Sequence, residues 1–187
     1  GMFKKGSKIP VDSIQFFDTI LHPGDAITTQ ERGVEHSVEV KHVPPILLVK
    51  EEEMLSKEEA RSRLGVPQSA EVWYVQLGAG QINDIESEIR LTIDALLEHN
   101  SELFIVIGES LLGKRVSFSN ERVRILRDYP NAIYFKGFDY SIQAGGYNSF
   151  HEMRSSQIPT IFYPNMNTGM DDQLARCRVA EEEGWGL

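Results

Sequence analysis

Two glycines followed by polar side chains give residues 143–152 the composition of a phosphate-binding turn. Gly145 and Gly146 precede Asn148 and Ser149, and Glu152 follows Ser149 by one helical turn. Glycines let a backbone approach a phosphate closely, and free amides at a helix start complement negative charge. A carboxylate one turn further accepts hydrogen bonds from two vicinal hydroxyls but repels phosphate. The segment therefore predicts a ligand with phosphate at the turn and a ribose further along the helix.

A purely structural interpretation of the same residues also stands. Ser149 and Glu152 have the S-x-x-E spacing of a capping box, in which serine caps the helix and glutamate reaches back to it. The sequence leaves both interpretations open.

Two further turns carry similar chemistry. Gly78, Ala79 and Gly80 follow the apolar run 72–77, and the spacing from there to Asn83 lacks the third glycine of the dinucleotide fingerprint. That spacing disfavours NAD as the ligand. The alternative to a phosphate-binding turn is a tight strand-to-helix turn that binds no ligand. Asp172-Gln173 stands where the last predicted helix begins, and the helix dipole favours a carboxylate there whatever the function.

Strand-like and helix-like stretches alternate from residue 44 onward. We expect strands at 46–49, 72–77, 103–107, 123–126, 140–143 and 159–163. Helices are expected at 57–64, from 83 or 84 to about 97, at 132–138, 148–155 and 171–183. This alternation predicts an α/β fold with a Rossmann-like parallel sheet and helices on both faces. Ligands of such sheets bind beyond the carboxyl ends of the strands, where all three turns lie.

Composition excludes several classes of protein. The chain has 187 residues and a net charge of 19 − 28 = −9, which disfavours nucleic-acid and anionic-membrane surfaces. The single cysteine, Cys177, excludes an internal disulfide and suits a reducing cytoplasm. No apolar run approaches the roughly 20 residues of a membrane span. The five histidines show no metal-ligand spacing, so each is expected at the surface or hydrogen-bonded, and no metal site is predicted. We expect a cytoplasmic protein.

The chain changes character near residue 44. Residues 1–43 mix short apolar pieces with turn formers and are expected to be a linker or a remnant of an N-terminal domain. Residues 44–187 are expected to form the binding domain, truncated at its C-terminus.

The turns together resemble a known signature. Gly146-Tyr147-Asn148-Ser149-x-x-Glu152, then Pro159, then Asp172-Gln173, resembles the donor-binding motif of GT-B nucleotide-sugar glycosyltransferases. Residues 45–187 are also similar to the C-terminal half of the bacterial N-acetylglucosaminyltransferase that makes the peptidoglycan lipid intermediate. The resemblance implies that Gly146, Asn148 and Ser149 hold a diphosphate and that Glu152 binds ribose hydroxyls.

The resemblance also assigns the remaining turns. Asp172 and Gln173 would contact hydroxyls of the donor sugar, Gly78–Gly80 would form a second phosphate-facing turn, and the base would lie near residues 126–129. This sequence departs from the plant signature at Ala144, where that signature has a histidine, and its loop before Asp172 is longer.

The function implied is that of a hexosyltransferase donor domain. It would bind a nucleotide-sugar, with a UDP-sugar as substrate, and would need neither a metal nor a cofactor. The general base of such enzymes usually comes from the N-terminal half. We therefore assign no catalytic residue in this chain and expect it to bind the nucleotide-sugar without turnover. The sugar and the acceptor stay unassigned. A noncatalytic sugar-nucleotide-binding or regulatory module and a NAD-dependent enzyme are the alternatives.

Overall fold

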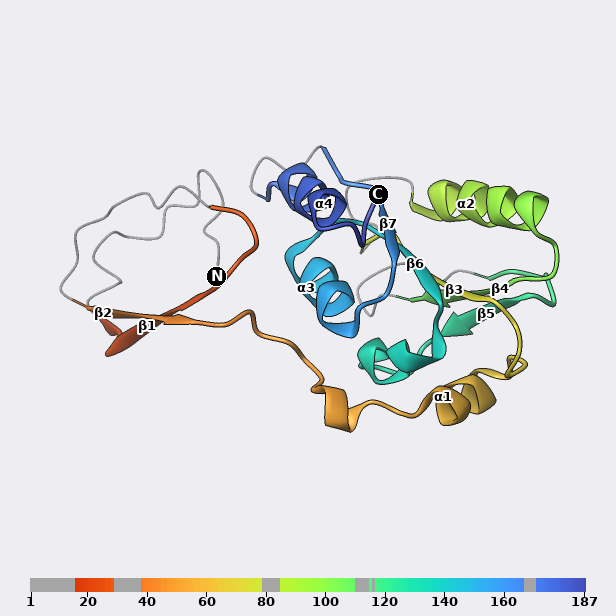
Figure 1. Cartoon of the computed structure of the whole chain (residues 1–187), viewed down its shortest axis with the longest axis horizontal. Coiled ribbons are helices and arrows are strands. Elements are labelled where there is room, and N and C mark those ends of the chain that lie inside the picture. The colour runs from red at the N-terminus through yellow and green to blue at the C-terminus, as the bar shows by residue number, and fades with distance from the viewer. Residues whose placement is uncertain (1–15, 29–37, 79–84, 110–114, 116, 167–170) are drawn as a thin grey trace.

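A parallel five-stranded sheet forms the centre of the molecule in the computed structural model, which describes residues 16–28, 38–78, 85–109, 115, 117–166 and 171–187 (Figure 1). Its strand order is β5-β4-β3-β6-β7, and every pair is parallel. The strands are β3 (Val72–Gln76), β4 (Phe104–Gly108), β5 (Val123–Leu126), β6 (Tyr140–Gln143) and β7 (Thr160–Phe162). The α/β fold class and five of the six predicted strands are thus confirmed.

Helices cover both faces of this sheet. On one face α2 (Ile85–His99) packs Ile89 and Ile93 against Val75 and Ile107. The opposite face carries α1 (Lys57–Leu64), the 3-10 helix η3 (Asn131–Gly137) and α3 (Tyr147–Ser156) (Figure 1). Finally, α4 (Gln173–Glu182) packs against α3 and β7. All five residues of β4 are buried, as expected for a strand covered on both sides.

The chain changes direction across the sheet between β3 and β6. From β3 the chain passes through α2 to β4 on one side, whereas β6 leads through α3 to β7 on the other. Helices therefore leave these two adjacent strands toward opposite faces, and such a switch point is where open α/β sheets bind ligands.

The predicted strand at 46–49 is wrong. Residues 44–50 form no strand, Ile46 and Leu48 are exposed, and only Val49 is buried. Pro44 and Pro45 cannot donate to a strand ladder, and Val49 instead packs with α1 and η3 in the core. Val49 is thus the one residue of this apolar run that anchors the segment to the core.

Residues before this run form a ladder of their own. β1 (Thr19–Pro23) pairs in parallel with β2 (Glu39–Val43), and the 3-10 helix η2 (Glu51–Glu53) follows. The C-terminal residues extend the main sheet, because Leu187 bonds to the Thr160 carbonyl and accepts from the Phe162 amide. No helix within the described ranges is both long and apolar enough to cross a bilayer.

Candidate functional site

Three strands end side by side at the edge where the glycine turns begin. The Ala144 amide donates to the Gln76 carbonyl over 3.2 Å, and the Tyr163 amide donates to the Gln143 carbonyl over 2.7 Å. The loops after β3, β6 and β7 therefore start from one edge of the sheet, at the switch point.

The first turn of α3 has free backbone donors. Gly146 is the N-cap, its φ and ψ are −65° and 155°, and no side chain caps the helix. The Phe150 amide bonds back to the Gly146 carbonyl, whereas the amides of Tyr147, Asn148 and Ser149 have no acceptor among the described residues. Three free N–H groups beside a glycine form an anion-binding arrangement.

The capping-box interpretation of Ser149 is wrong. Ser149 is the third residue of α3, past the N-cap position, and its hydroxyl makes no hydrogen bond within the described structure. Asn148 is exposed and likewise has no partner there. Both side chains are available to a ligand at the helix start.

Glu152 is half-buried and has no hydrogen-bond partner in the described part of the chain. This burial raises the pKa of Glu152 to about 7. Burial raises the pKa of Tyr74 on β3; a hydrogen bond from Asn131 opposes this rise, and the charge of nearby Glu152 adds to it. Tyr74 donates to Gln76 Oε1 and accepts from Asn131 Nδ2, each over 3.1 Å. Glu152 makes no hydrogen bond to Tyr74, Gln76 or Asn131 among the contacts of the described residues.

Gln143 is a polar residue of this region that the sequence did not single out. It ends β6 in register with Gln76, its side chain is fully buried, and neither amide atom has a partner in the structure as described. Buried amides are costly when unbonded, so they mark places where a water or ligand is expected. Its position one residue before Ala144 was the available signal.

The start of α4 lies against the glycine turn. Gln173 Oε1 accepts from the Asn165 amide over 2.8 Å, and a Cβ on Gly146 would lie 3.9 Å from Gln173 Nε2. Asp172 caps α4 by accepting from the Ala175 amide over 3.0 Å, and it is exposed. Gln173 is thus beside the turn, whereas Asp172 performs the helix-capping role.

The turn after β3 is only partly described. Gly78 is exposed and has a φ of 97°, a left-handed conformation that favours glycine. Ala79 and Gly80 lie outside the described residues. The structure brings Gly145, Gly146 and Gln173 together beside Ser149 and Glu152.

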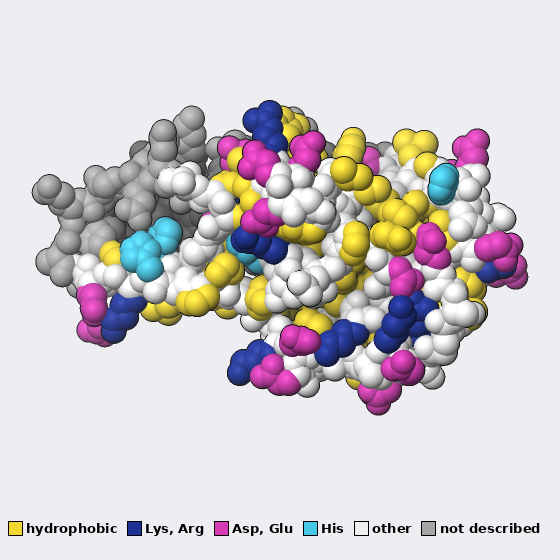
Figure 2. Space-filling model, viewed as in Figure 1, with side chains coloured by type: hydrophobic (Ala, Val, Ile, Leu, Met, Phe, Trp, Pro, Cys, Tyr) yellow, Lys and Arg dark blue, Asp and Glu magenta, His cyan; other side chains and the backbone are white. Residues whose placement is uncertain are grey.

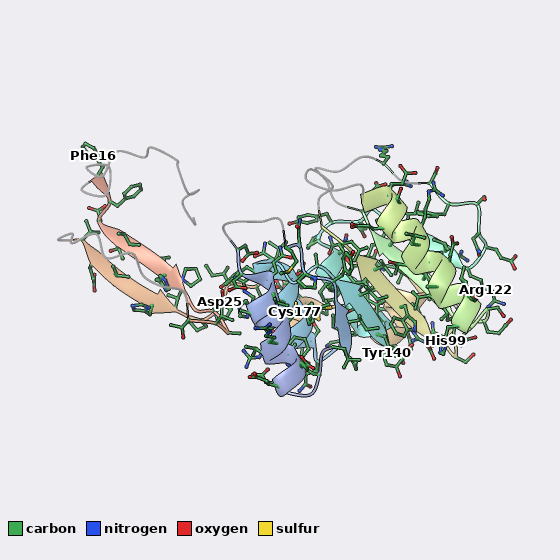
Figure 3. The ribbon with its side chains drawn as sticks, turned by 90° about the horizontal axis from the view of Figure 1, so that it is seen from above. Phe16, Asp25, His99, Arg122, Tyr140 and Cys177 are labelled. Atoms are coloured by element: carbon green, nitrogen blue, oxygen red, sulfur yellow. The ribbon has the colours of Figure 1, made fainter. Side chains whose placement is uncertain are left out.

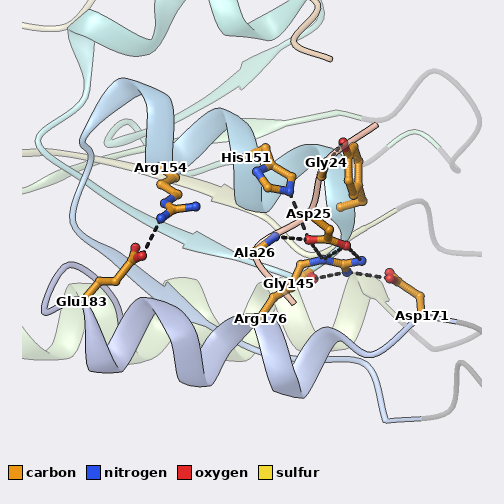
Figure 4. A network of polar contacts seen from close by, with 10 residues as sticks. Gly24, Asp25, Ala26, Gly145, His151, Arg154, Asp171, Arg176 and Glu183 are labelled. Carbon is orange, nitrogen blue, oxygen red and sulfur yellow. Dashed lines mark hydrogen bonds and ion pairs between the residues drawn. The ribbon is translucent and has the colours of Figure 1, made fainter. Parts of the chain in front are cut away.

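A buried ionic network borders the same turn and was not predicted (Figure 4). Arg176 of α4 binds Asp25 through Nε at 2.9 Å and Nη2 at 2.7 Å, and its Nη1 reaches Asp171 at 2.5 Å. His151 Nε2 lies 3.1 Å from Asp25 Oδ1, so the histidine is buried and hydrogen-bonded, one of the two expected outcomes. No periodic pattern links residues this far apart, which is why the sequence gave no sign of the network.

Burial and charge set the protonation of the network. Burial by itself would raise the pKa of Asp25. The hydrogen bonds and positive charge of Arg176 outweigh this effect, so the pKa of Asp25 lies below its ordinary value. Burial lowers the pKa of His151. Asp25 is therefore ionised and His151 neutral at pH 7.

The visible surface mixes both charges. Figure 2 shows acidic and basic side chains interspersed over the sheet domain, without a continuous basic area among the residues coloured there. Within the described ranges, no three His, Cys, Asp or Glu side chains are grouped as metal ligands would be.

Solved structures share this architecture. The glycotransferase of kitacinnamycin matches with a TM-score of 0.55 and 14% identity, over 79% of this chain and 35% of that one. The spinosyn forosaminyltransferase SpnP matches with a TM-score of 0.55 and 15% identity, over 91% of this chain and 41% of that one. The fold is that of a GT-B domain.

A third match to the GT-B domain is the spinosyn rhamnosyltransferase SpnG, solved with thymidine diphosphate. Its TM-score is 0.51 at 20% identity, over 64% of this chain and 31% of that one. This chain thus spans about a third to two fifths of the enzymes it matches. No protein-family model and no curated protein matches the sequence.

Proposed function

We propose that this GT-B domain binds the nucleotide-sugar donor of a glycosyltransferase at the start of α3. One observation carries the proposal: at the switch point between β3 and β6, three amides of the first helical turn and the half-buried Glu152 have no hydrogen-bond partner among the described residues. The amides suit a diphosphate, and the carboxylate suits hydroxyls one helical turn deeper. A ligand with both groups in that order is a nucleoside diphosphate.

Individual residues take roles that follow from this placement. Gly145 and Gly146 let the diphosphate approach, Asn148 and Ser149 donate to it, and Glu152 accepts from the ribose. Gln173, beside the turn, contacts the donor sugar. Asp172 and the turn Gly78-Ala79-Gly80 are further donor contacts in the proposal.

The same geometry supports transfer of a hexosyl group. When the bond between the sugar C1 and the diphosphate oxygen breaks, negative charge gathers on the leaving diphosphate, and the α3 amides and helix dipole stabilise it. The acceptor oxygen bonds to C1, and its proton passes to a base outside the residues described. Residues 44–187 would be the donor domain and residues 1–43 a linker.

UDP is the nucleotide we expect. Glu152 can accept from both ribose hydroxyls of UDP but from only one hydroxyl of the deoxyribose in dTDP. Calorimetric titration with UDP, dTDP and NAD tests this order, with UDP binding most tightly. Tighter binding of NAD would support a dinucleotide enzyme, and binding of none of the three would overturn the proposal.

A substitution tests the role of Glu152. Replacing Glu152 by alanine should weaken UDP binding by about 1–3 kcal/mol through lost charge-assisted hydrogen bonds. Glu98→Ala is the matched control, because Glu98 is exposed on α2, on the other face of the sheet. Equal affinities of the two folded variants would refute the role.

A further inference from the structure

Residues 24–26 lie against the starts of both α3 and α4, although they come from the far end of the chain. Figure 3 places Asp25 where the β1–β2 ladder meets α4. We infer that Asp25 is a positioning residue for the diphosphate-binding turn, so that docking of residues 24–26 and nucleotide binding favour each other. This inference rests on the proposed function.

Arg176 transmits the position of Asp25 to the turn. Its guanidinium is fully buried; Nε and Nη2 bind Asp25, while Nη1 binds Asp171 and lies 3.4 Å from the Gly145 carbonyl oxygen. A guanidinium is planar and rigid, so the carboxylate on one edge fixes the direction of the N–H groups on the other. Asp25 thereby orients the donor that faces Gly145.

Tyr147 makes a second, independent connection. It is the first residue of α3, directly after Gly146, and its hydroxyl donates to the Gly24 carbonyl over 2.7 Å. Its ring lies 4.6 Å from the His151 ring and 5.5 Å from the Arg176 guanidinium. Residues 24–26 thus hold the turn through Gly145 on one side and Tyr147 on the other.

Charge alone predicts the opposite effect of removing Asp25. Two carboxylates, Asp25 and Asp171, surround one guanidinium beside a neutral His151, so the network carries a net negative charge. Removing one carboxylate near an anion site strengthens anion binding electrostatically. Weaker nucleotide binding after Asp25→Asn would therefore report lost positioning.

Calorimetric titration with UDP on the full chain tests the inference. Asp25→Asn should weaken UDP binding about tenfold and Tyr147→Phe about fivefold, within the usual range of coupling between sites. Asp25→Glu, which keeps the carboxylate, should recover part of the loss. Lys41→Ala is the control, because Lys41 lies exposed on β2 and pairs with Glu39 in the part of the chain that the structure describes. Thermal unfolding verifies that each variant is folded.

Amide hydrogen exchange measures the reciprocal effect. Coupling between two equilibria is symmetric, so UDP should slow exchange at Gly24, whose amide bonds to the Val43 carbonyl, and at Ala26. A purely structural role of Asp25 would leave these rates unchanged by UDP.

The outcomes separate the two proposals. If the wild-type chain binds neither UDP nor dTDP, the proposed function fails and the inference with it. If the wild-type chain binds UDP but Asp25→Asn and Tyr147→Phe bind it equally well or more tightly, only the inference is overturned. Should Asp25→Asn not fold, Tyr147→Phe decides, because it removes one hydroxyl and no charge.

Discussion

A Cβ atom on Gly145 would stand 2.6 Å from the Sγ of Cys177 and 3.1 Å from the Gln173 carbonyl oxygen. The turn after β6 therefore packs its backbone directly against α4. Glycine is required at this position because a side chain would collide with α4. The backbone of Gly145 is not in the left-handed region.

Gly145→Ala should lower the free energy of unfolding by about 1–3 kcal/mol, because the methyl group forces α3 and α4 apart. Urea unfolding measures the change. Gly146→Ala is the matched control: the described atom nearest to its Cβ would be Gln173 Nε2 at 3.9 Å, so the loss should be below about 1 kcal/mol. Equal losses in the two variants would contradict the packing argument.

Gly146→Ala should nevertheless weaken UDP binding about tenfold, because the added methyl group occupies the approach of the phosphate to the α3 amides. Calorimetry on the folded variant measures this. Affinity equal to that of the wild type would show that the ligand does not approach Gly146 closely.

Glu152→Gln should stabilise the ligand-free protein at pH 8. The folded-state pKa of Glu152 is about 7, above its ordinary value of 4.5, so the folded state binds more protons between these values. The free energy of unfolding therefore falls as pH rises through that window, and glutamine removes the penalty. We expect a gain of about 1–3 kcal/mol at pH 8 and almost none at pH 4.5. A gain of the same size at both pH values would show that titration is not its cause.

UDP affinity should increase more steeply with pH in the wild type than in Glu152→Gln. Ribose hydroxyls bind the ionised carboxylate, so the nucleotide favours the state that forms as pH rises through about 7. UDP titrates identically in both experiments, so the difference between the two proteins isolates Glu152. Parallel pH profiles from pH 6 to 8 would contradict a contact with the ionised carboxylate.

Arg61→Met should destabilise the domain by about 3–5 kcal/mol, although Arg61 is far from the proposed ligand. Arg61 is buried and binds the carbonyls of Gly137, Gln68 and Ala70 as well as Asp139. Arg90→Ala, which removes an exposed pair with Glu86 on α2, should cost about 0.5 kcal/mol or less. Urea unfolding measures the stability of both variants. Similar losses of unfolding free energy would show that burial does not set the contribution of these arginines.

Asp139→Asn should reduce stability at pH 7 and lose that effect in acid. Burial alone raises the pKa of Asp139, but Lys57, the Val72 amide and Arg61 lower it below its ordinary value. The stabilisation is therefore present above pH 3.8 and lost as pH falls through the folded-state pKa. The stabilities of wild type and variant should converge as pH falls below 3.8, through the lowered folded-state pKa.

Periodic and local features were predictable from the sequence. Continuous apolar runs identified the buried strands, and the helix expected at 57–64 is α1. The Ser56 hydroxyl caps its start by accepting from the Glu59 amide, and Gly65 ends it at a φ of 65°. The strand predicted at 46–49 was wrong because a short apolar stretch after two prolines can equally well form a loop that packs one residue against the core.

The candidate site was predictable where it depends on one turn of chain. One turn and the helix start that follows it carry Gly145, Gly146, Ser149 and Glu152. Residues so close in the chain are held close in space by the helix itself. Asp25, which meets the turn only through tertiary packing, left no local signal. Whether Ser149 capped α3 depended on where the helix begins, and Gly146 sets that point.

Asp25 and Arg176 are separated by 151 positions in the chain. On the ribosome Asp25 emerges long before its partner, and at about 5–20 residues per second the delay is roughly 8–30 seconds. Throughout that interval the carboxylate stays hydrated, and β3 to β7 can assemble without it. The buried charge pair therefore forms only after α4 has left the exit tunnel.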